Sequence, residues 1–284
     1  MDLYTKNIGK TFSGVNVLRN VDFNVEPGEV HALVGENGAG KSTFSKILSG
    51  VYTPTEGEIF LDEKKIQIAS PIAAQKNGIS LIHQEPQSFS HLSVAENIFM
   101  GHMDGSNFSR VKWNDINKSS EKILLSIGLK INPKNIMEGL SIADQQMIEI
   151  AGALSKNSKI IIMDEPTSPL TPNEVGKLFD IVNQLKNQGM AIIFISHRLE
   201  EIRAIADRVT IFRDGDLIAT KKINEITNEE IIKFMIGRNI EEIDVIENEY
   251  LKKNEIILSV NNISQLGNFK NISFDLKKGE ILGF

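Results

Sequence analysis

The side chains best suited to chemistry in this sequence stand at the end of a glycine-rich run. Residues 35–42 read GENGAGKS, which fits the G-x-x-x-x-G-K-[ST] pattern of a loop that cradles phosphates. Glycines let backbone N–H groups point at phosphate oxygens, and the lysine reaches the β and γ oxygens. A glycine-rich turn with a solvated lysine is the alternative. The predicted nucleotide-binding residues are Gly35, Glu36, Asn37, Gly38, Ala39, Gly40, Lys41, Ser42 and Thr43, with Ser42 also a Mg²⁺ ligand.

A second chemical feature is a pair of adjacent carboxylates. Asp164 and Glu165 follow the apolar run at residues 160–163, where a strand leaves its sheet. We expect Asp164 to hold the magnesium shell and Glu165 to polarise an attacking water as general base, a contribution typically worth about 10² to 10⁴ in rate. An acidic strand end exposed to water is the alternative, and Lys41 upstream makes it less favourable.

The elements around these residues indicate an α/β core. Residues 29–34 predict a strand, and after the glycine-rich turn Phe44, Ile47 and Leu48 recur at helical spacing. The apolar runs KIIIMD and AIIFIS are each followed by a helical pattern, as in a parallel sheet covered by helices. Between these units, a polar stretch at 101–120 and predicted helices at 121–129 and 141–154 indicate an inserted helical lobe.

Composition excludes several classes of protein. The 284 residues are 41% hydrophobic and 24% charged, and the net charge of −6 gives no broad attraction to nucleic acid. Without cysteine, disulfides and thiolate metal sites are impossible. The N-terminus lacks the apolar core of a secretion signal, and no apolar run is long enough to cross a bilayer. We therefore expect a cytoplasmic protein that reaches a membrane only through a partner.

Five motifs in order resemble the ABC ATPases over nearly the whole chain. Besides the two features above, Gln84 in LIHQEP looks like the Q-loop glutamine, LSIADQQ at 140–146 like the signature motif, and His197 in ISHR like the switch histidine. The resemblance implies MgATP as ligand, with Gln84 sensing Mg²⁺ and the attacking water and coupling the site to a membrane partner. It implies that His197 contacts the γ-phosphate. A satisfied structural histidine is the alternative for that position.

The same resemblance carries the fold class and an adenine contact. It implies an α/β P-loop NTPase (RecA-like) core with a small antiparallel β subdomain and an inserted helical subdomain at about 86–155. Phe12 lies 29 residues before Lys41, where the family typically has an aromatic residue stacking on adenine. The alternative, which the sequence leaves equally open, is that Phe12 packs in the hydrophobic core.

The signature segment predicts a helix N-terminus turned outward. Ser141 and Asp144 resemble a capping box ahead of an apolar helix face. In the family this end closes over the nucleotide of a second domain, so hydrolysis needs a pair. LSIAD replaces the usual LSGGQ and PLT at 169–171 replaces ALD, changes that alter the site facing this signature and communication across the pair. The predicted in-trans residues are Ser141, Ile142, Ala143 and Asp144.

The chain begins to repeat itself near its end. NVDFNVEPGEVHAL at 20–33 lines up with NISFDLKKGEILGF at 271–284, so a second phosphate loop would start at 286. We expect a first ABC domain at 1–240, a connector at 241–254, and the truncated start of a second domain at 255–284. LSI-x-DQQM with a partial second copy resembles the first half of tandem ATPases from ribose, galactose and xylose type importers. QEP at 84–86 and SPLTP at 168–172 also resemble the branch that imports furanosyl autoinducers.

These observations predict an ATP-hydrolysing importer subunit on the cytoplasmic face of a membrane. Its expected partners are a second ABC domain, an integral membrane permease and, indirectly, an external sugar-binding protein, with a simple sugar or sugar-like signal as cargo. One alternative is a soluble tandem ABC ATPase acting on ribosomes or DNA, which the acidic balance and the lack of a basic linker disfavour. Another is a nucleotide-binding module that is inactive without its second half.

Overall fold

The computed structural model describes residues 2–101, 111–237 and 255–283. The chain divides into two compact units, Met1–Arg238 and Asn239–Phe284, which are described separately. The predicted connector at 241–254 lies outside the described residues. No helix in the described ranges combines the length and the apolar content needed to span a membrane.

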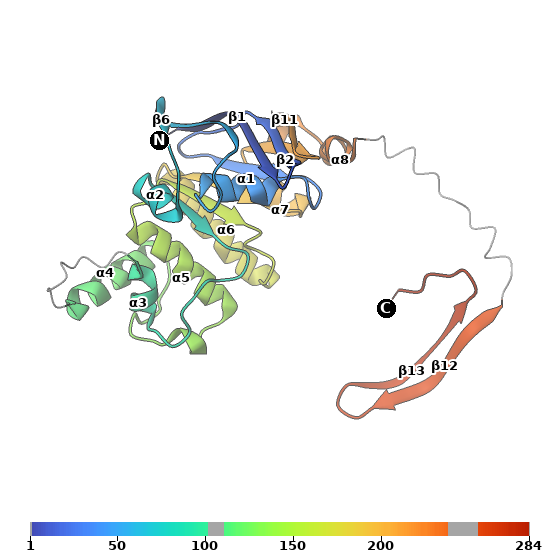
Figure 1. Ribbon diagram of the computed structural model, residues 1–284. Helices are drawn as coiled ribbons and strands as arrows, with labels where there is room; N and C mark the ends of the chain where they lie inside the picture. The colour runs from blue at the N-terminus through green and yellow to red at the C-terminus, as the bar shows by residue number, and fades with distance from the viewer. Residues whose placement is uncertain (1, 102–110, 238–254, 284) are drawn as a thin grey trace. The chain divides into compact units, whose positions relative to one another are not determined.

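One large sheet organises the first unit (Figure 1). Within the described ranges its order is β6-β5-β1-β2-β11-β10-β4-β9-β8-β7, and β3 also pairs with β1. β10, β4, β9, β8 and β7 run parallel, whereas β1 pairs antiparallel with β2, β3 and β5. The strands are β1 (Leu3–Phe12), β2 (Val15–Val21), β3 (Asn24–Val25), β4 (Val30–Val34), β5 (Glu56–Leu61), β6 (Lys64–Ile66), β7 (Ile79–Ile82), β8 (Ile160–Asp164), β9 (Ala191–Ile195), β10 (Arg208–Arg213) and β11 (Asp216–Lys222).

The parallel strands are buried on both faces, which is why their sequences are continuous apolar runs. Side chains alternate between two buried clusters with the period of two that a strand imposes. In β8, Ile161 and Met163 enter one cluster, while Ile160 and Ile162 enter the other. The predicted α/β class with a parallel core and an antiparallel part is confirmed.

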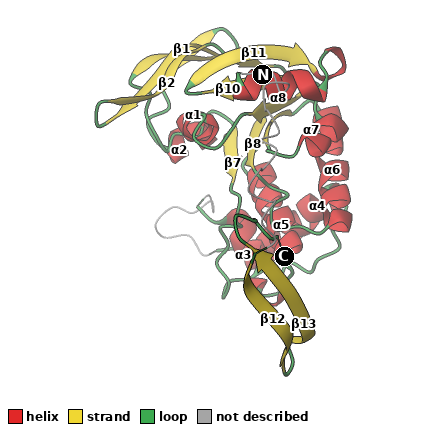
Figure 2. Cartoon of the chain, turned by 90° about the vertical axis from the view of Figure 1, so that its right-hand side faces the viewer, coloured by secondary structure: helices red, strands yellow, loops and turns green. Residues whose placement is uncertain are grey.

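Helices cover both faces of the sheet (Figure 2). α1 (Lys41–Leu48) and α2 (Pro71–Lys76) pack in the cluster that also holds residues of the antiparallel strands. On the other face, α6 (Pro172–Asn187), α7 (Leu199–Ile205) and α8 (Asn228–Ile236) share the second cluster. A single-turn helix, η2 (Ile223–Glu225), precedes α8. The helix that follows the phosphate loop, α1, therefore packs on one face of the sheet.

A helical lobe made of α3 (Val94–Phe99), α4 (Trp113–Ser126), η1 (Met137–Gly139) and α5 (Ile142–Ser155) joins the second cluster. The helix expected at 121–129 was wrongly bounded. It begins at Trp113, inside the polar stretch at 101–120, and ends at Ser126. Gly128 ends it with φ 76°, and the N–H of Leu129 donates to the carbonyl of Leu124 at 2.9 Å, as in a Schellman motif.

In the second unit, β12 (Ile256–Gln265) and β13 (Phe269–Lys277) form an antiparallel hairpin. The backbone of this unit repeats two unusual conformations of the first. Asn20 and Asn271 have φ values of 45° and 55°, and Gly28 and Gly279 have 71° and 80°. These positions correspond in the sequence repeat.

Candidate functional site

The phosphate loop connects β4 to α1 at the carboxyl edge of the parallel strands. Two of its glycines are required by close approach of neighbouring chain segments. A Cβ added to Gly35 would lie 2.4 Å from the carbonyl oxygen of Phe212, and one added to Gly40 would lie 2.6 Å from Cδ2 of Leu18. The loop thus packs closely against β10 and β2, and these contacts restrict its backbone conformation before any ligand binds.

Lys41 lies almost wholly buried under this loop. Its Nζ donates to the carbonyl oxygens of Gly35 at 2.8 Å and Glu36 at 3.1 Å. Burial lowers the pKa of Lys41, against the attraction of the Glu165 and Asp164 carboxylates, which raises it. The ammonium group is therefore held at the loop with few water contacts, where an anion would replace the carbonyl acceptors.

Asp164 and Glu165 lie at the end of β8, and their environments differ. Burial raises the pKa of Asp164, with Glu165 adding to the effect, while Lys46, Lys41 and His83 oppose it. Glu165 adopts the left-handed backbone region with φ 47°, and its N–H donates to the carbonyl of Ile195 at 2.9 Å. This uncommon conformation turns the chain sharply after Asp164, so the two carboxylates leave the strand in different directions.

His197 lies beside Glu165. Nδ1 of the imidazole is 3.2 Å from Oε1 of the carboxylate, and the side chain of His197 is 55% exposed. β9 ends two residues before His197 and is the parallel neighbour of β8. Because parallel neighbours end at the same edge of a sheet, two residues 32 positions apart in the sequence meet there.

Gln84 follows β7, at the same edge. Its side chain is exposed, and Nε2 lies 3.5 Å from the hydroxyl oxygen of Ser168 in the loop after β8. Sequence reasoning missed the preceding residue, His83. Burial lowers the pKa of His83, and Lys46 adds to the effect, whereas the charge of Asp164 opposes it. Its place at a strand end, one residue before the predicted glutamine, was the available signal.

Phe12 lies at the end of β1 and is absent from both buried clusters. Its ring is 37% exposed and meets the ring of Tyr52 edge-on at 5.1 Å. Nζ of Lys10 lies 4.9 Å from the centre of the Phe12 ring. An aromatic ring with an exposed surface and a nearby cation can stack on a planar base.

The signature residues cap α5, but not with a reciprocal capping box. The Ser141 hydroxyl oxygen accepts from the N–H of Asp144 at 3.1 Å, and the same hydroxyl donates to Oδ2 of Asp144 at 3.0 Å. The expected bond from the residue-144 side chain back to the N–H of Ser141 is absent from the described contacts, since aspartate is one methylene shorter than glutamate. Ile142 is exposed and Ala143 is buried. Within the described ranges, no hydrogen bond or ion pair joins this segment to the Lys41 loop.

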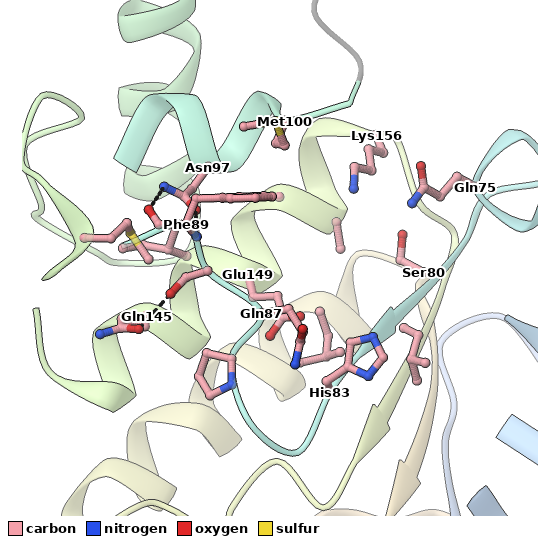
Figure 3. Close-up of a pocket in the computed structure, with 18 residues that line it drawn as sticks. Gln75, Ser80, His83, Gln87, Phe89, Asn97, Met100, Gln145, Glu149 and Lys156 are labelled. Atoms are coloured by element: carbon pink, nitrogen blue, oxygen red, sulfur yellow. Dashed lines mark hydrogen bonds between the residues drawn. The ribbon is translucent and has the colours of Figure 1, made fainter. Parts of the chain in front are cut away.

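A groove lies between the loop after β7 and the helical lobe, one residue from Gln84. It encloses about 260 Å³ and is lined by residues of that loop, of α3 and of α5 (Figure 3). Figure 3 shows Phe89 and Met100 toward one end, and Glu149 with Gln87 and His83 toward the other. The groove thus reaches the carboxyl end of β7, where His83 precedes Gln84.

Comparison with known proteins identifies a matching family and similar sequences. The sequence matches the ABC transporter family over residues 18–168. It is 47% identical over 282 residues to the ribose import ATP-binding protein RbsA of Clostridium tetani, covering 99% of this chain and 55% of that protein. It is 46% identical over 284 residues to the galactose/methyl galactoside import ATP-binding protein MglA of Clostridium perfringens, covering 99% and 54%. The chain spans about half the length of these curated relatives.

Solved structures are similar as well. The ATP-binding cassette MJ1267 of an ABC transporter, in its ADP conformation, superposes with a TM-score of 0.74 at 27% identity, covering 84% of this chain and 100% of that one. CbiO1 of Clostridium perfringens, part of the ABC transporter complex cbiONQ, gives 0.70 at 26% identity, covering 85% and 96%. The predicted P-loop NTPase fold is confirmed.

Proposed function

Because this chain belongs to the ABC transporter family, we propose that it binds ATP with Mg²⁺ and hydrolyses it as the motor of an importer for a simple sugar. The main support for the proposal is that the carboxyl ends of four neighbouring parallel strands lie at one edge of the sheet. Lys41 follows β4, Asp164 and Glu165 end β8, His197 follows β9 and Gln84 follows β7. A cation, two carboxylates and an imidazole at one edge match the needs of phosphoryl transfer to water.

The residues at this edge fit a magnesium ion. Mg²⁺ prefers oxygen donors, and the Asp164 carboxylate and the Ser42 hydroxyl supply them, with Gln84 as a further oxygen donor. Burial raises the pKa of Asp164, so its ionised form lacks a full counter-charge from the protein. A bound divalent cation would supply that charge. When present, the ion neutralises phosphate charge between the β and γ groups.

The protein's own groups would divide the remaining work. We assign nucleotide binding to residues 35–43, with Lys41 leaving the carbonyls of Gly35 and Glu36 for the β and γ oxygens. Glu165 accepts a proton from the attacking water, and His197 holds Glu165 on one side while contacting the γ-phosphate on the other. Phe12 provides a ring for the adenine.

A second ABC domain completes the site in this proposal. The outward end of α5, residues 141–144, would act on nucleotide held by that domain, where the Asp144 carboxylate weakens phosphate attraction. We propose that residues 1–240 form the first ABC domain and that 255–284 begin the second. The matching backbone conformations of Asn20 with Asn271 and of Gly28 with Gly279 support this division.

The cargo and the membrane partner are proposed from the relatives. Their names describe import of ribose, galactose and methyl galactoside, which favours an importer over a soluble ATPase. The chain would then work at the cytoplasmic face of a membrane, bound to a permease that an external sugar-binding protein serves. We propose that the permease docks in the groove beside Gln84, because a segment seated there touches the loop that carries this residue.

Transport in reconstituted vesicles tests the proposal. The full-length protein that contains this chain is assembled with its permease in proteoliposomes, and MgATP-driven movement of radiolabelled ribose and galactose is measured with the matching binding protein. We expect movement with one of these sugars and none in the Glu165→Gln variant. ATP hydrolysis without any permease association would instead indicate a soluble ATPase.

A further inference from the structure

We propose that Glu149 recognises a basic residue of the permease segment that docks in the groove. The Glu149 carboxylate forms an ion pair with a lysine or arginine side chain of that segment. This inference rests on the proposed function. It adds a recognition residue and the chemistry of its partner.

The groove has two chemically different ends. Phe89, Met100 and Met137 supply an aromatic ring and two flexible thioethers, and the Phe89 side chain is 56% exposed. Glu149 lies with Gln87 and His83 toward the other end, and Lys156 lies apart from them (Figure 3). An occupant that fits both parts carries an apolar side chain and a polar or charged side chain on the same face.

The Glu149 carboxylate is only partly satisfied by its own chain. Two backbone N–H groups, those of His83 and Gln87, stabilise its charge, and Lys156 attracts it. Burial outweighs these contributions and raises the pKa of Glu149 to about 7. Oε2 is buried and has no hydrogen-bond partner among the described residues. An ionised carboxylate in such a place is stabilised by any cation that arrives with the occupant.

The ammonium group of Lys156 is not paired with the Glu149 carboxylate. Lys156 lies about two turns further along, at the C-cap of α5, and no ion pair within 4.0 Å joins it to Glu149 in the described part of the chain. A metal ion is also a poor match. The described residues contain no group of three or more histidine, cysteine or acidic side chains placed to hold one. A guanidinium or ammonium group from the partner needs only the one carboxylate.

The position of Glu149 connects two moving parts of the proposed motor. It lies on α5, the helix that Ser141 caps, and it lines the groove together with His83 and Gln87 of the loop that carries Gln84. A basic side chain seated at Glu149 therefore touches the signature helix and the glutamine loop together. Docking strength and hydrolysis should respond jointly to the charge at position 149.

Photo-crosslinking first identifies the occupant. Phe89 is replaced by p-benzoyl-phenylalanine in the full-length protein, native membranes are irradiated, and the joined peptides are sequenced by mass spectrometry. We expect a cytoplasmic segment of a multi-spanning permease with a lysine or arginine within about one helical turn of the crosslinked residue. If no permease is joined and none co-purifies, the proposed function itself fails.

Charge reversal then tests the recognition. Glu149→Lys should lower co-purification of the identified permease more than tenfold, and Glu149→Gln should lower it less. Glu121→Lys makes the same charge change on the exposed face of α4 and should have no effect. Replacing the partner's basic residue with glutamate should restore binding to Glu149→Lys.

Two results would overturn the inference while leaving the importer proposal intact. One is permease binding by both Glu149 variants at the wild-type level. The other is a loss in both variants that the partner's charge swap does not repair, which would assign Glu149 a structural role. Thermal melts of each variant in the full-length protein identify any failure to fold, and Glu149→Gln, which adds no charge, then carries the test.

Discussion

Nδ1 of His197 lies 3.2 Å from Oε1 of Glu165, across the ends of two adjacent parallel strands. Glu165 adopts a left-handed backbone conformation, with φ 47°, directly after β8 ends, and its N–H donates to the carbonyl of Ile195, the last residue of β9. The imidazole can hold the carboxylate in one orientation, as a general base requires.

The first prediction concerns this pair. Glu165→Gln keeps the size of the side chain and one acceptor oxygen but removes its charge and basicity. In the full-length protein we expect MgATP binding to remain and hydrolysis to fall by about 10² to 10⁴. His197→Ala should lower hydrolysis as well, and the double variant should be no slower than Glu165→Gln, since the two side chains act as a unit. Single-turnover hydrolysis measures all three, and unchanged turnover in Glu165→Gln would remove the base assignment.

The second prediction concerns Lys41. Its ammonium group is already held at the loop by two backbone carbonyls, so it loses little freedom when a phosphate replaces them. Lys41→Ala should weaken ATP binding about 10-fold to 100-fold, as expected for loss of hydrogen bonds to a charged group. Lys177→Ala, at an exposed position on α6, is the matched control. Equal affinity of the two variants in a fluorescent-nucleotide titration would contradict the phosphate-loop assignment.

The third prediction concerns the loop backbone. Gly35→Ala places a Cβ against the carbonyl oxygen of Phe212, and the backbone must shift to accept it. We expect a loss of about 1–3 kcal/mol in the free energy of unfolding, together with weaker nucleotide binding. Gly176→Ala is the contrasting change, because this helical glycine of α6 has open space around it and should gain about 0.5–1 kcal/mol. Urea unfolding of both variants checks the difference in sign.

The fourth prediction concerns stability against pH. The pKa of Glu149 is raised from an ordinary value of 4.5 to about 7, so the folded chain binds this proton more tightly than the unfolded chain. The unfolded state then holds fewer protons between about pH 4.5 and 7, and stability falls as pH rises through that window. The effect is absent below the window and complete above it, at up to about 3 kcal/mol. Glu149→Gln should therefore be more stable than wild type at pH 8 and similar at pH 4.

Glu121→Gln is the control for this experiment, because it makes the same change at an exposed position of the helical lobe. Its difference from wild type should be nearly independent of pH. Melting curves for the three proteins at several pH values give the answer. A constant difference between Glu149→Gln and wild type across the range would show that this carboxyl does not titrate as its burial requires.

Much of the fold could be predicted from local patterns. The strands and the phosphate loop were predictable because each depends on a short run of residues. The start of α4 was not, since residues 113–120 are mostly polar and their helix is stabilised by packing of later residues such as Leu124. The antiparallel part of the sheet was predicted only from the resemblance to the ABC ATPases.

The groove could not be predicted for a related reason. Glu149 reads in the sequence as an ordinary polar residue of an amphipathic helix. Its raised pKa depends on burial by a loop more than 60 residues earlier, whose path over α5 no local pattern encodes. The pairing of Glu165 with His197 was easier to anticipate, because parallel strands bring their carboxyl ends to one edge.

The carbonyl of Phe212 that excludes a side chain from Gly35 belongs to a strand with a second attachment. The next residue, Arg213, donates through Nη1 to the carbonyl of Phe234 in the last turn of α8, at 3.1 Å. The final helix of the first unit is thereby tethered one residue from the phosphate loop. A displacement of that loop would therefore be transmitted through two adjacent residues of β10 to the backbone of α8.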